Sequence, residues 1–131
     1  MKKVAFVCIH NSCRSQMAEG WAKELGEGII EPYSAGTESY PEVKPKAVTV
    51  MAEAGVDISQ QYPKLLSDIP ADVDVLITMG CGVTCPYVPC TQREDWGLDD
   101  PSGGSLDDFR ATRDQIEAKV RKLIADIQKE P

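Results

Sequence analysis

Short apolar runs alternate with segments of helical periodicity, and this alternation is the strongest constraint on the fold. The run Val4–Val7 is followed by residues 15–25, in which apolar side chains recur at helical spacing. A second run, 29–36, precedes a segment that begins like a helix at Pro45 and ends at Gly55. Strands that alternate with helices usually pair in parallel, so the sequence predicts an α/β fold with a parallel sheet flanked by helices.

The second half of the chain continues this pattern less regularly. Residues 72–79 are mostly apolar and predict a buried strand, whereas 80–101 is rich in Gly and Pro and is expected to be mostly loop. The longest helix is predicted over 106–127, where apolar residues form one stripe. We find no internal repeat or linker, so we expect a single domain over residues 1–131.

Composition and charge restrict the partners of the chain. A net charge of −7 argues against general binding to nucleic acid or to an anionic membrane. No apolar run approaches the roughly 20 residues that a membrane-spanning helix needs. The short apolar stretch at the N-terminus is followed directly by Arg14, which is unlike a signal peptide. We therefore expect a cytoplasmic protein, with a monomer as the default state.

The loop from Cys8 to Ser15 joins the first predicted strand to the first predicted helix. Ligands of open α/β sheets bind beyond the carboxyl ends of strands, and loop N–H groups with a helix N-terminus attract anions. Arg14 offers a planar fork for two oxygens of a tetrahedral oxyanion. The same positive field favours a thiolate at Cys8, to which Ser15 can donate a hydrogen bond, so Cys8 is a candidate nucleophile. The alternative is a buried cysteine at a strand end beside a surface arginine.

Five cysteines, at positions 8, 13, 81, 85 and 90, are an odd set that does not suit a secreted disulfide scaffold. Three interpretations of Cys81, Cys85 and Cys90 remain open. A zinc site lacks the usual paired spacing, and the only histidine lies in the nucleophile loop. The cysteines could instead be buried and inert. The third interpretation is a redox relay, which the surrounding glycines and prolines favour because such a segment must move.

Several segments together resemble the arsenate reductases of the low-molecular-weight tyrosine phosphatase fold, thioredoxin-coupled type. They are "CIHNSCRSQMAEGWAKELG", "YSAG", "PKAVTVMAEAGVDIS" and "EDWGLDDPSG", and the likeness extends from Lys3 to about Ile127. The resemblance implies a three-layer sandwich with a central four-stranded parallel sheet flanked by helices. It also implies reduction of arsenate to arsenite, with phosphate or sulfate as substrate analogues.

The resemblance assigns roles to individual residues. Cys8 would be the nucleophile, Arg14 the oxyanion clamp, Ser15 the thiolate partner and Asn11 an organiser of the loop. Asp100, directly before a proline, would be the general acid; alternatively, it only begins a turn or caps the last helix. The residues expected to surround the oxyanion are Ile9, His10, Asn11, Ser12, Cys13, Arg14 and Ser15.

Reduction of arsenate needs two electrons, and the sequence contains no flavin or nicotinamide fingerprint, so we expect no cofactor. Two thiols that become one disulfide supply that pair of electrons. In the implied relay, Cys81 attacks Cys8 and Cys85 then attacks Cys81, after which thioredoxin reduces the disulfide. Cys90 is the alternate to Cys85. Because the loop carries Ile9-His10 where thioredoxin-linked relatives usually have Thr-Gly, a low-molecular-weight thiol is the alternative donor.

Two further expectations concern ions and competing functions. Some relatives bind potassium through residues that match Asn11, Glu19 and Ser34, but Lys64 takes the place of the fourth ligand, so we predict no metal site and no potassium requirement. A tyrosine phosphatase would need the same Cys8 loop and acid but not the cysteine-rich segment. A non-catalytic module that binds oxyanions or senses redox state would bind arsenate without turnover.

Overall fold

The computed structural model describes residues 1–38, 40–79 and 90–129. In chain order the elements are β1 (Lys2–Cys8), α1 (Arg14–Leu25), β2 (Ile30–Gly36), α2 (Pro45–Glu53), the 3-10 helix η1 (Leu66–Asp68), β3 (Val73–Thr78), β4 (Cys90–Asp95) and α3 (Leu106–Gln128). The strands form one parallel sheet in the order β2-β1-β3-β4. The predicted α/β fold with a four-stranded parallel sheet is confirmed.

One strand differs from what periodicity predicts. The segment 80–101 was expected to be mostly loop, yet β4 lies within it and pairs in parallel with β3. Its residues, from Cys90 to Asp95, are polar and mostly exposed because β4 forms an edge of the sheet. An exposed edge strand has no buried face, so no alternation of apolar and polar residues marks it in the sequence.

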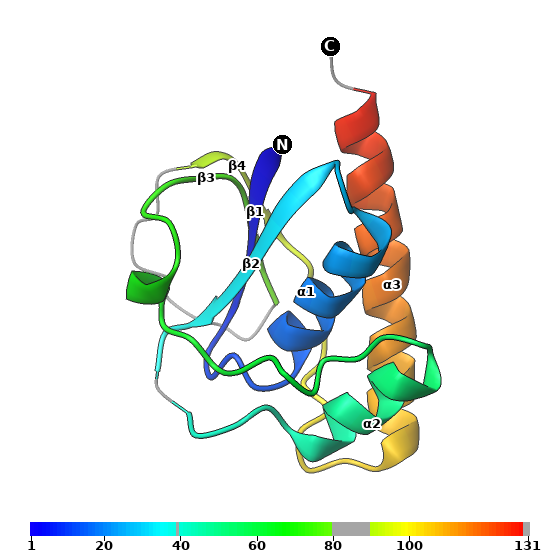
Figure 1. The fold of residues 1–131 in the computed structure, drawn as a ribbon. Coiled ribbons are helices and arrows are strands. Elements are labelled where there is room, and N and C mark those ends of the chain that lie inside the picture. The colour runs from blue at the N-terminus through cyan, green and yellow to red at the C-terminus, as the bar shows by residue number, and fades with distance from the viewer. Residues whose placement is uncertain (39, 80–89, 130–131) are drawn as a thin grey trace.

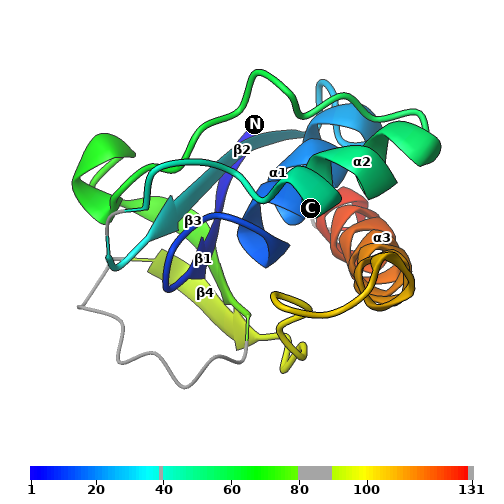
Figure 2. The ribbon, with the colours of Figure 1, turned by 90° about the horizontal axis from the view of Figure 1, so that it is seen from below.

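The two faces of the sheet are covered differently. Figures 1 and 2 show α1, α2 and α3 together on one side of the sheet, with η1 on the other. Val4 and Phe6 of β1 belong to the larger core cluster with the helices, whereas the alternating residues Ala5 and Val7 belong to a smaller cluster. Because both faces of β1 are buried, the run Val4–Val7 is continuously apolar.

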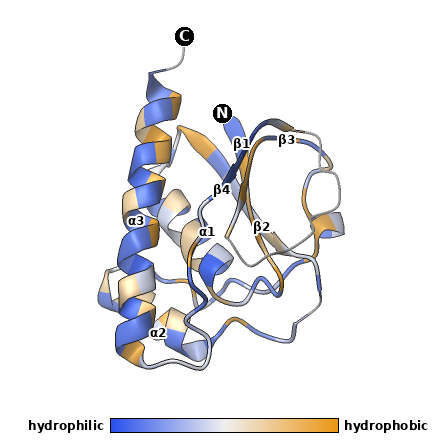
Figure 3. Cartoon of the chain, turned by 180° about the vertical axis from the view of Figure 1, so that it is seen from behind, coloured by the Kyte–Doolittle hydropathy of each residue, from blue (hydrophilic) through white to orange (hydrophobic). Residues whose placement is uncertain are grey.

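The helix ends differ in how their free backbone groups are satisfied. At α3, Ser105 and Asp108 form a reciprocal capping box, with Asp108 N donating to Ser105 Oγ at 3.3 Å. Figure 3 shows hydrophilic residues over most of the viewed side of α3, interrupted by hydrophobic positions. At α1, by contrast, Cys13 occupies the N-cap and makes no capping hydrogen bond from its side chain. The first turn of α1 therefore keeps N–H groups for an external anion.

Within the described residues, no helix combines the length and hydrophobicity that crossing a bilayer requires.

Candidate active site

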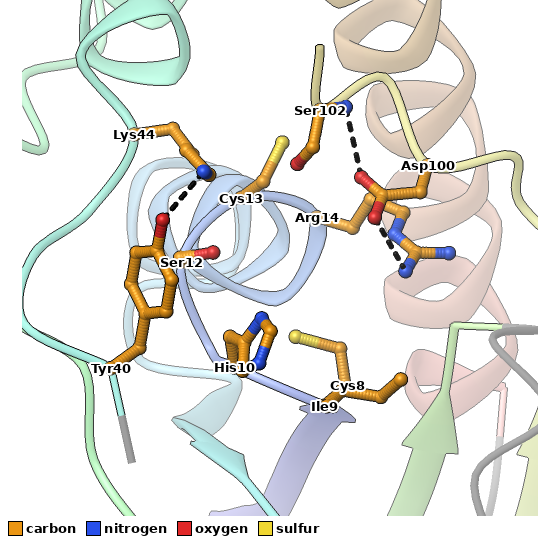
Figure 4. Close-up of a pocket in the computed structure, with 10 residues that line it drawn as sticks. All are labelled: Cys8, Ile9, His10, Ser12, Cys13, Arg14, Tyr40, Lys44, Asp100 and Ser102. Carbon is orange, nitrogen blue, oxygen red and sulfur yellow. Dashed lines mark hydrogen bonds and ion pairs between the residues drawn. The ribbon is translucent and has the colours of Figure 1, made fainter. Parts of the chain in front are cut away.

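The loop between β1 and α1 borders a pocket at the carboxyl edge of the sheet, where ligands of open α/β sheets bind. The pocket has a volume of about 260 Å³. Figure 4 shows side chains from the loop, from the segment before α2 and from the segment before α3 converging on it. The lining residues are Cys8, Ile9, His10, Ser12, Cys13, Arg14, Tyr40, Lys44, Asp100 and Ser102.

The sulfur of Cys8 accepts hydrogen bonds from the loop that follows it. The backbone N–H of Asn11 donates to Cys8 Sγ at 3.1 Å, and Ser15 Oγ lies 2.8 Å from the same sulfur. Asn11 has a φ of +54°, in the left-handed region that turns its N–H toward the sulfur. Asparagine tolerates this region better than most residues. Both donors stabilise a thiolate at Cys8.

The direction of the hydrogen bond between Ser15 and Cys8 follows from the network behind it. The backbone N–H of Lys64 can only donate, and it donates to Asn11 Oδ1 at 2.8 Å. The oxygen of the Asn11 amide therefore faces Lys64, and its nitrogen donates to Ser15 Oγ at 2.8 Å. Because Ser15 accepts that bond, its own hydrogen is left to donate to Cys8. Sequence reasoning identified Asn11 and Ser15, but it did not find the backbone of Lys64.

The loop is braced from behind by the extension of β2. Thr37 N donates to Cys8 O at 3.2 Å, and Glu38 N donates to Ile9 O at 2.9 Å. A Cβ at Gly36 would lie 2.6 Å from Ile9 O, so only glycine permits this close approach of the two backbones. The sequence predicts Gly36 as the end of the strand 29–36 and as part of the family segment "YSAG", and the structure adds this close backbone approach as its physical role.

Arg14 is held almost completely buried at the start of α1. Its Nη1 donates to Met79 O at 3.0 Å and to Leu98 O at 2.8 Å, at the ends of two other segments of the chain. These two bonds fix the guanidinium beside the pocket. Nη2 lies 3.7 Å from Asp100 Oδ2, and this edge of the fork faces the pocket.

Asp100 lies across the pocket from the loop and is half-exposed. Burial alone would raise the pKa of its carboxyl, but hydrogen bonds from Ser102, with Arg14 and Lys44 nearby, hold the net pKa below its ordinary value. One of those bonds comes from Ser102 N to Asp100 Oδ1 at 3.0 Å. Asp100 is therefore a carboxylate at neutral pH before an oxyanion binds, placed where an acid could reach the bound anion. The structure thus brings Asp100 together with Cys8 and Arg14.

Cys13 has surroundings different from those of Cys8, although both thiols line the pocket. Burial, and to a lesser degree the charge of Asp100, raise the pKa of the Cys13 thiol far above its ordinary value. Cys13 is therefore a protonated thiol at neutral pH and is a poor nucleophile.

Lys44 was not predicted as a site residue, yet it lines the pocket beside Tyr40. Lys44 Nζ donates to the Tyr40 hydroxyl at 2.6 Å, and the Tyr40 ring lies 4.8 Å from the His10 ring, centroid to centroid. Both precede α2, far from the loop in sequence. No motif connects Lys44 to Cys8, so only the fold could reveal its place in the pocket.

Of the three thiols proposed for the relay, only Cys90 lies within the described residues. Cys81 and Cys85 fall outside the described residues. Cys90 is a free thiol that pairs with Val73 at the start of β3. The strand register places it level with Lys2, at the opposite end of β1 from Cys8, about 20 Å away along the strand direction.

The residues compared with a potassium site are brought together by the fold. Ser34 Oγ donates to Glu19 Oε1 at 2.5 Å, and Lys64 Nζ lies 3.5 Å from that same carboxylate oxygen. The ammonium of Lys64 thus supplies positive charge to the buried Glu19. In the described parts of the chain, no cluster of histidine, cysteine and carboxylate side chains has the geometry of a metal site. Independence from potassium remains a prediction.

A buried cysteine set at the end of a strand, over a loop that presents N–H groups and an arginine to one pocket, defines a thiol-nucleophile enzyme for tetrahedral oxyanions. Comparison with known families agrees. The model of the low molecular weight phosphotyrosine protein phosphatase family matches residues 3–131. The chain belongs to that family, among its arsenate reductases.

Three relatives show how far this similarity extends. A glutaredoxin arsenate reductase from Synechocystis is 51% identical over 131 residues, which cover 97% of this chain and 99% of the relative. A solved arsenate reductase in the phosphate binding state is 51% identical with a TM-score of 0.89, covering 97% of this chain and 99% of its own. A thioredoxin-dependent arsenate reductase from Corynebacterium glutamicum is 31% identical with a TM-score of 0.80, covering 98% of this chain and 62% of its own.

Proposed function

We propose that this protein reduces arsenate to arsenite through a covalent adduct on Cys8, with the electrons supplied by its own cysteines and then by an external thiol donor. The observation that carries the proposal is the pair of hydrogen-bond donors, Asn11 N–H and Ser15 Oγ–H, at the sulfur of Cys8. Such donors favour a thiolate at the floor of a pocket that Arg14 borders. Phosphate and sulfate would bind there as analogues.

In the first step, the Cys8 thiolate attacks arsenic and one oxygen of arsenate departs. That oxygen needs a proton, and Asp100 is the group placed to transfer one. Because Asp100 is a carboxylate before arsenate binds, the proton must arrive with the arsenate and pass through Asp100 to the departing oxygen. The product of this step is a Cys8 thiol-arsenate adduct and water.

In the second step, the thiolate of Cys81 attacks the sulfur of Cys8. The electrons of the sulfur–arsenic bond pass to arsenic, which leaves as arsenite, and a Cys8–Cys81 disulfide forms. Cys85 then attacks Cys81, releases Cys8 and moves the disulfide outward. Two thiols are oxidised for each arsenate reduced, so electrons balance without a cofactor.

Two candidates exist for the donor that reduces the final disulfide. Thioredoxin is the expectation from the sequence, and one relative is named thioredoxin-dependent. The relative that is 51% identical is instead named a glutaredoxin arsenate reductase. The higher identity favours glutaredoxin with glutathione. Either donor belongs to the reducing cytoplasm, where we place the reaction.

One assay tests the reaction and the donor together. Arsenate-dependent NADPH consumption is measured with thioredoxin and thioredoxin reductase, and separately with glutaredoxin, glutathione and glutathione reductase. We expect turnover with the glutaredoxin system and none for the Cys8→Ser variant in either system. Turnover with thioredoxin alone would overturn the donor assignment, and no turnover with either system would overturn the proposed function.

A further inference from the structure

Lys44 is attached to the oxyanion loop through its backbone. It is the residue directly before α2, and its N–H donates to Ser12 O at 2.7 Å. Its side chain is half-buried and lines the pocket together with Tyr40. Figure 4 shows Lys44 and Tyr40 on one side of the pocket and Arg14 and Asp100 on the other, with the sulfur of Cys8 between them. A second cation thus faces Arg14 across the space where an oxyanion would bind.

The charges around the pocket make this second cation significant. Arg14 already faces the Asp100 carboxylate at 3.7 Å, so one positive and one negative charge offset each other there. His10 faces Glu38, with Nε2 to Oε2 at 3.4 Å. Lys44 donates to a phenol rather than to a carboxylate, and none of the ion pairs found among residues 1–38, 40–79 and 90–129 includes it. Lys44 is therefore the cation that offsets the thiolate of Cys8, and in a protein without that thiolate it leaves the pocket with a net positive charge.

We propose that Lys44 determines which oxyanions the pocket accepts, because its ammonium turns from the Tyr40 hydroxyl to the bound anion and balances a second negative charge. The pocket would then prefer dianionic tetrahedral oxyanions to monoanionic ones of the same shape. The hydrogen bond with Tyr40, with a smaller contribution from the Asp100 carboxylate, raises the pKa of Lys44, so the residue is an ammonium before the anion binds. This inference rests on the proposed function only in taking the loop as an anion site.

The test compares two tetrahedral anions that differ in charge, sulfate and perchlorate. Their affinities are measured by NMR titration of the Cys8→Ser protein with and without Lys44→Gln. We expect Lys44→Gln to weaken sulfate binding about tenfold, as loss of a charge-assisted hydrogen bond implies, and perchlorate binding by less than about twofold. Lys44→Arg should restore the preference for sulfate.

Lys46→Gln is the matched control. Lys46 carries the same charge two positions further along, but its ammonium donates to Gly104 O at 2.7 Å and does not line the pocket. It should leave the ratio of the two affinities unchanged. Equal losses for sulfate and perchlorate in Lys44→Gln would overturn the proposal and assign Lys44 a role in holding the loop. Unchanged sulfate affinity would also overturn it.

The experiment stands apart from the redox chemistry, since it uses a protein without the nucleophile and without any electron donor. If arsenate reduction fails in the coupled assays while the sulfate preference depends on Lys44, only the proposed function is overturned. If reduction succeeds and the preference does not depend on Lys44, only this inference is overturned.

Discussion

Cys8 and Cys13 lie in one loop, yet their surroundings give their sulfur atoms opposite chemistry. The sulfur of Cys8 accepts hydrogen bonds from Asn11 and Ser15, which favour the charged form. For Cys13, burial and the charge of Asp100 raise the thiol pKa and favour the uncharged form. The sequence alone identified Cys8 because it begins a loop between a predicted strand and a predicted helix, and that loop carries Arg14 and Ser15. It could not show how deeply Cys13 is buried, because burial is a property of the packed loop.

We predict that iodoacetamide at neutral pH labels Cys8 at least about tenfold faster than Cys13, because the thiolate is the reactive form. Peptide mass spectrometry over a time course measures both rates in one sample. Inorganic phosphate should protect Cys8 by occupying the pocket. Cys13→Ala is the control and should leave the Cys8 rate nearly unchanged. Equal labelling of the two cysteines would contradict the assignment of Cys8 as the nucleophile.

Asp100 provides a second prediction at this scale. Because its pKa is lowered, Asp100 is a carboxylate at any pH above the ordinary aspartate pKa near 3.9, and the proton for the departing oxygen enters with arsenate. We therefore expect kcat/KM to fall with rising pH as arsenate in solution loses its second proton, because the monoanion gives one proton to Asp100 and is then held in the pocket as the dianion. A kcat/KM that rises over that pH range would contradict this route for the proton.

Asp100→Asn separates acid catalysis from binding. We expect kcat to fall about 100-fold, within the usual range for loss of a general acid. Phosphate binding should persist or tighten, because a negative charge beside Arg14 is removed. Asp99→Asn is the matched control, since Asp99 is exposed and does not line the pocket of Cys8. Equal losses of kcat in the two variants would show that the activity depends on the conformation of the segment around Asp99 and Asp100 rather than on the Asp100 carboxyl.

Among the elements, those with a buried face could be predicted from the sequence and those without one could not. Val4–Val7 and the apolar stripe of α3 can be recognised in the sequence because burial selects apolar residues at a fixed period. The edge strand β4 is almost fully exposed, so burial selects no apolar pattern in its sequence. The candidate site divides in the same way. The loop between β1 and α1 is contiguous and was predicted, whereas Lys44 reaches the pocket only through the packing of α2 against the loop.

Gly36, at the end of β2, tests how the neighbouring strand shapes the loop. Gly36→Ala would place a methyl group 2.6 Å from Ile9 O and 3.0 Å from Asn11 N, so the loop backbone must shift. We expect phosphate affinity, measured by NMR titration, to fall about tenfold or more because the N–H groups lose their alignment.

Gly20→Ala is the control for a general loss of packing. The added methyl group at Gly20 would lie 2.6 Å from Ile58 Cγ2, but that neighbour is a side-chain atom, and neither Gly20 nor Ile58 lines the pocket. We expect a change in melting temperature with little change in phosphate affinity. If Gly20→Ala weakens phosphate binding as much as Gly36→Ala does, the effect comes from the core rather than from the shape of the loop.

For the whole molecule, the parallel sheet decides which thiols can meet. A disulfide requires Cα atoms roughly 4.4–6.8 Å apart, whereas β3 and β4 hold Cys90 about 20 Å from Cys8 along the strand direction. Cys90 therefore cannot form a disulfide directly with Cys8 while the sheet is intact. Cys90 can form a disulfide only after another thiol has carried the oxidation away from the pocket. This order fits a role for Cys90 as the alternate final thiol of the relay.

We predict that a single turnover with arsenate and no external donor yields a disulfide between two of Cys81, Cys85 and Cys90, and never between Cys8 and Cys90. Peptide mapping by mass spectrometry after acid quenching identifies the pair. Cys85→Ser should trap the Cys8–Cys81 disulfide, whereas Cys90→Ser should leave the wild-type product unchanged. A Cys8–Cys90 disulfide would require the β3–β4 edge to open during the reaction. Normal multiple turnover by both Cys85→Ser and Cys90→Ser would exclude the relay.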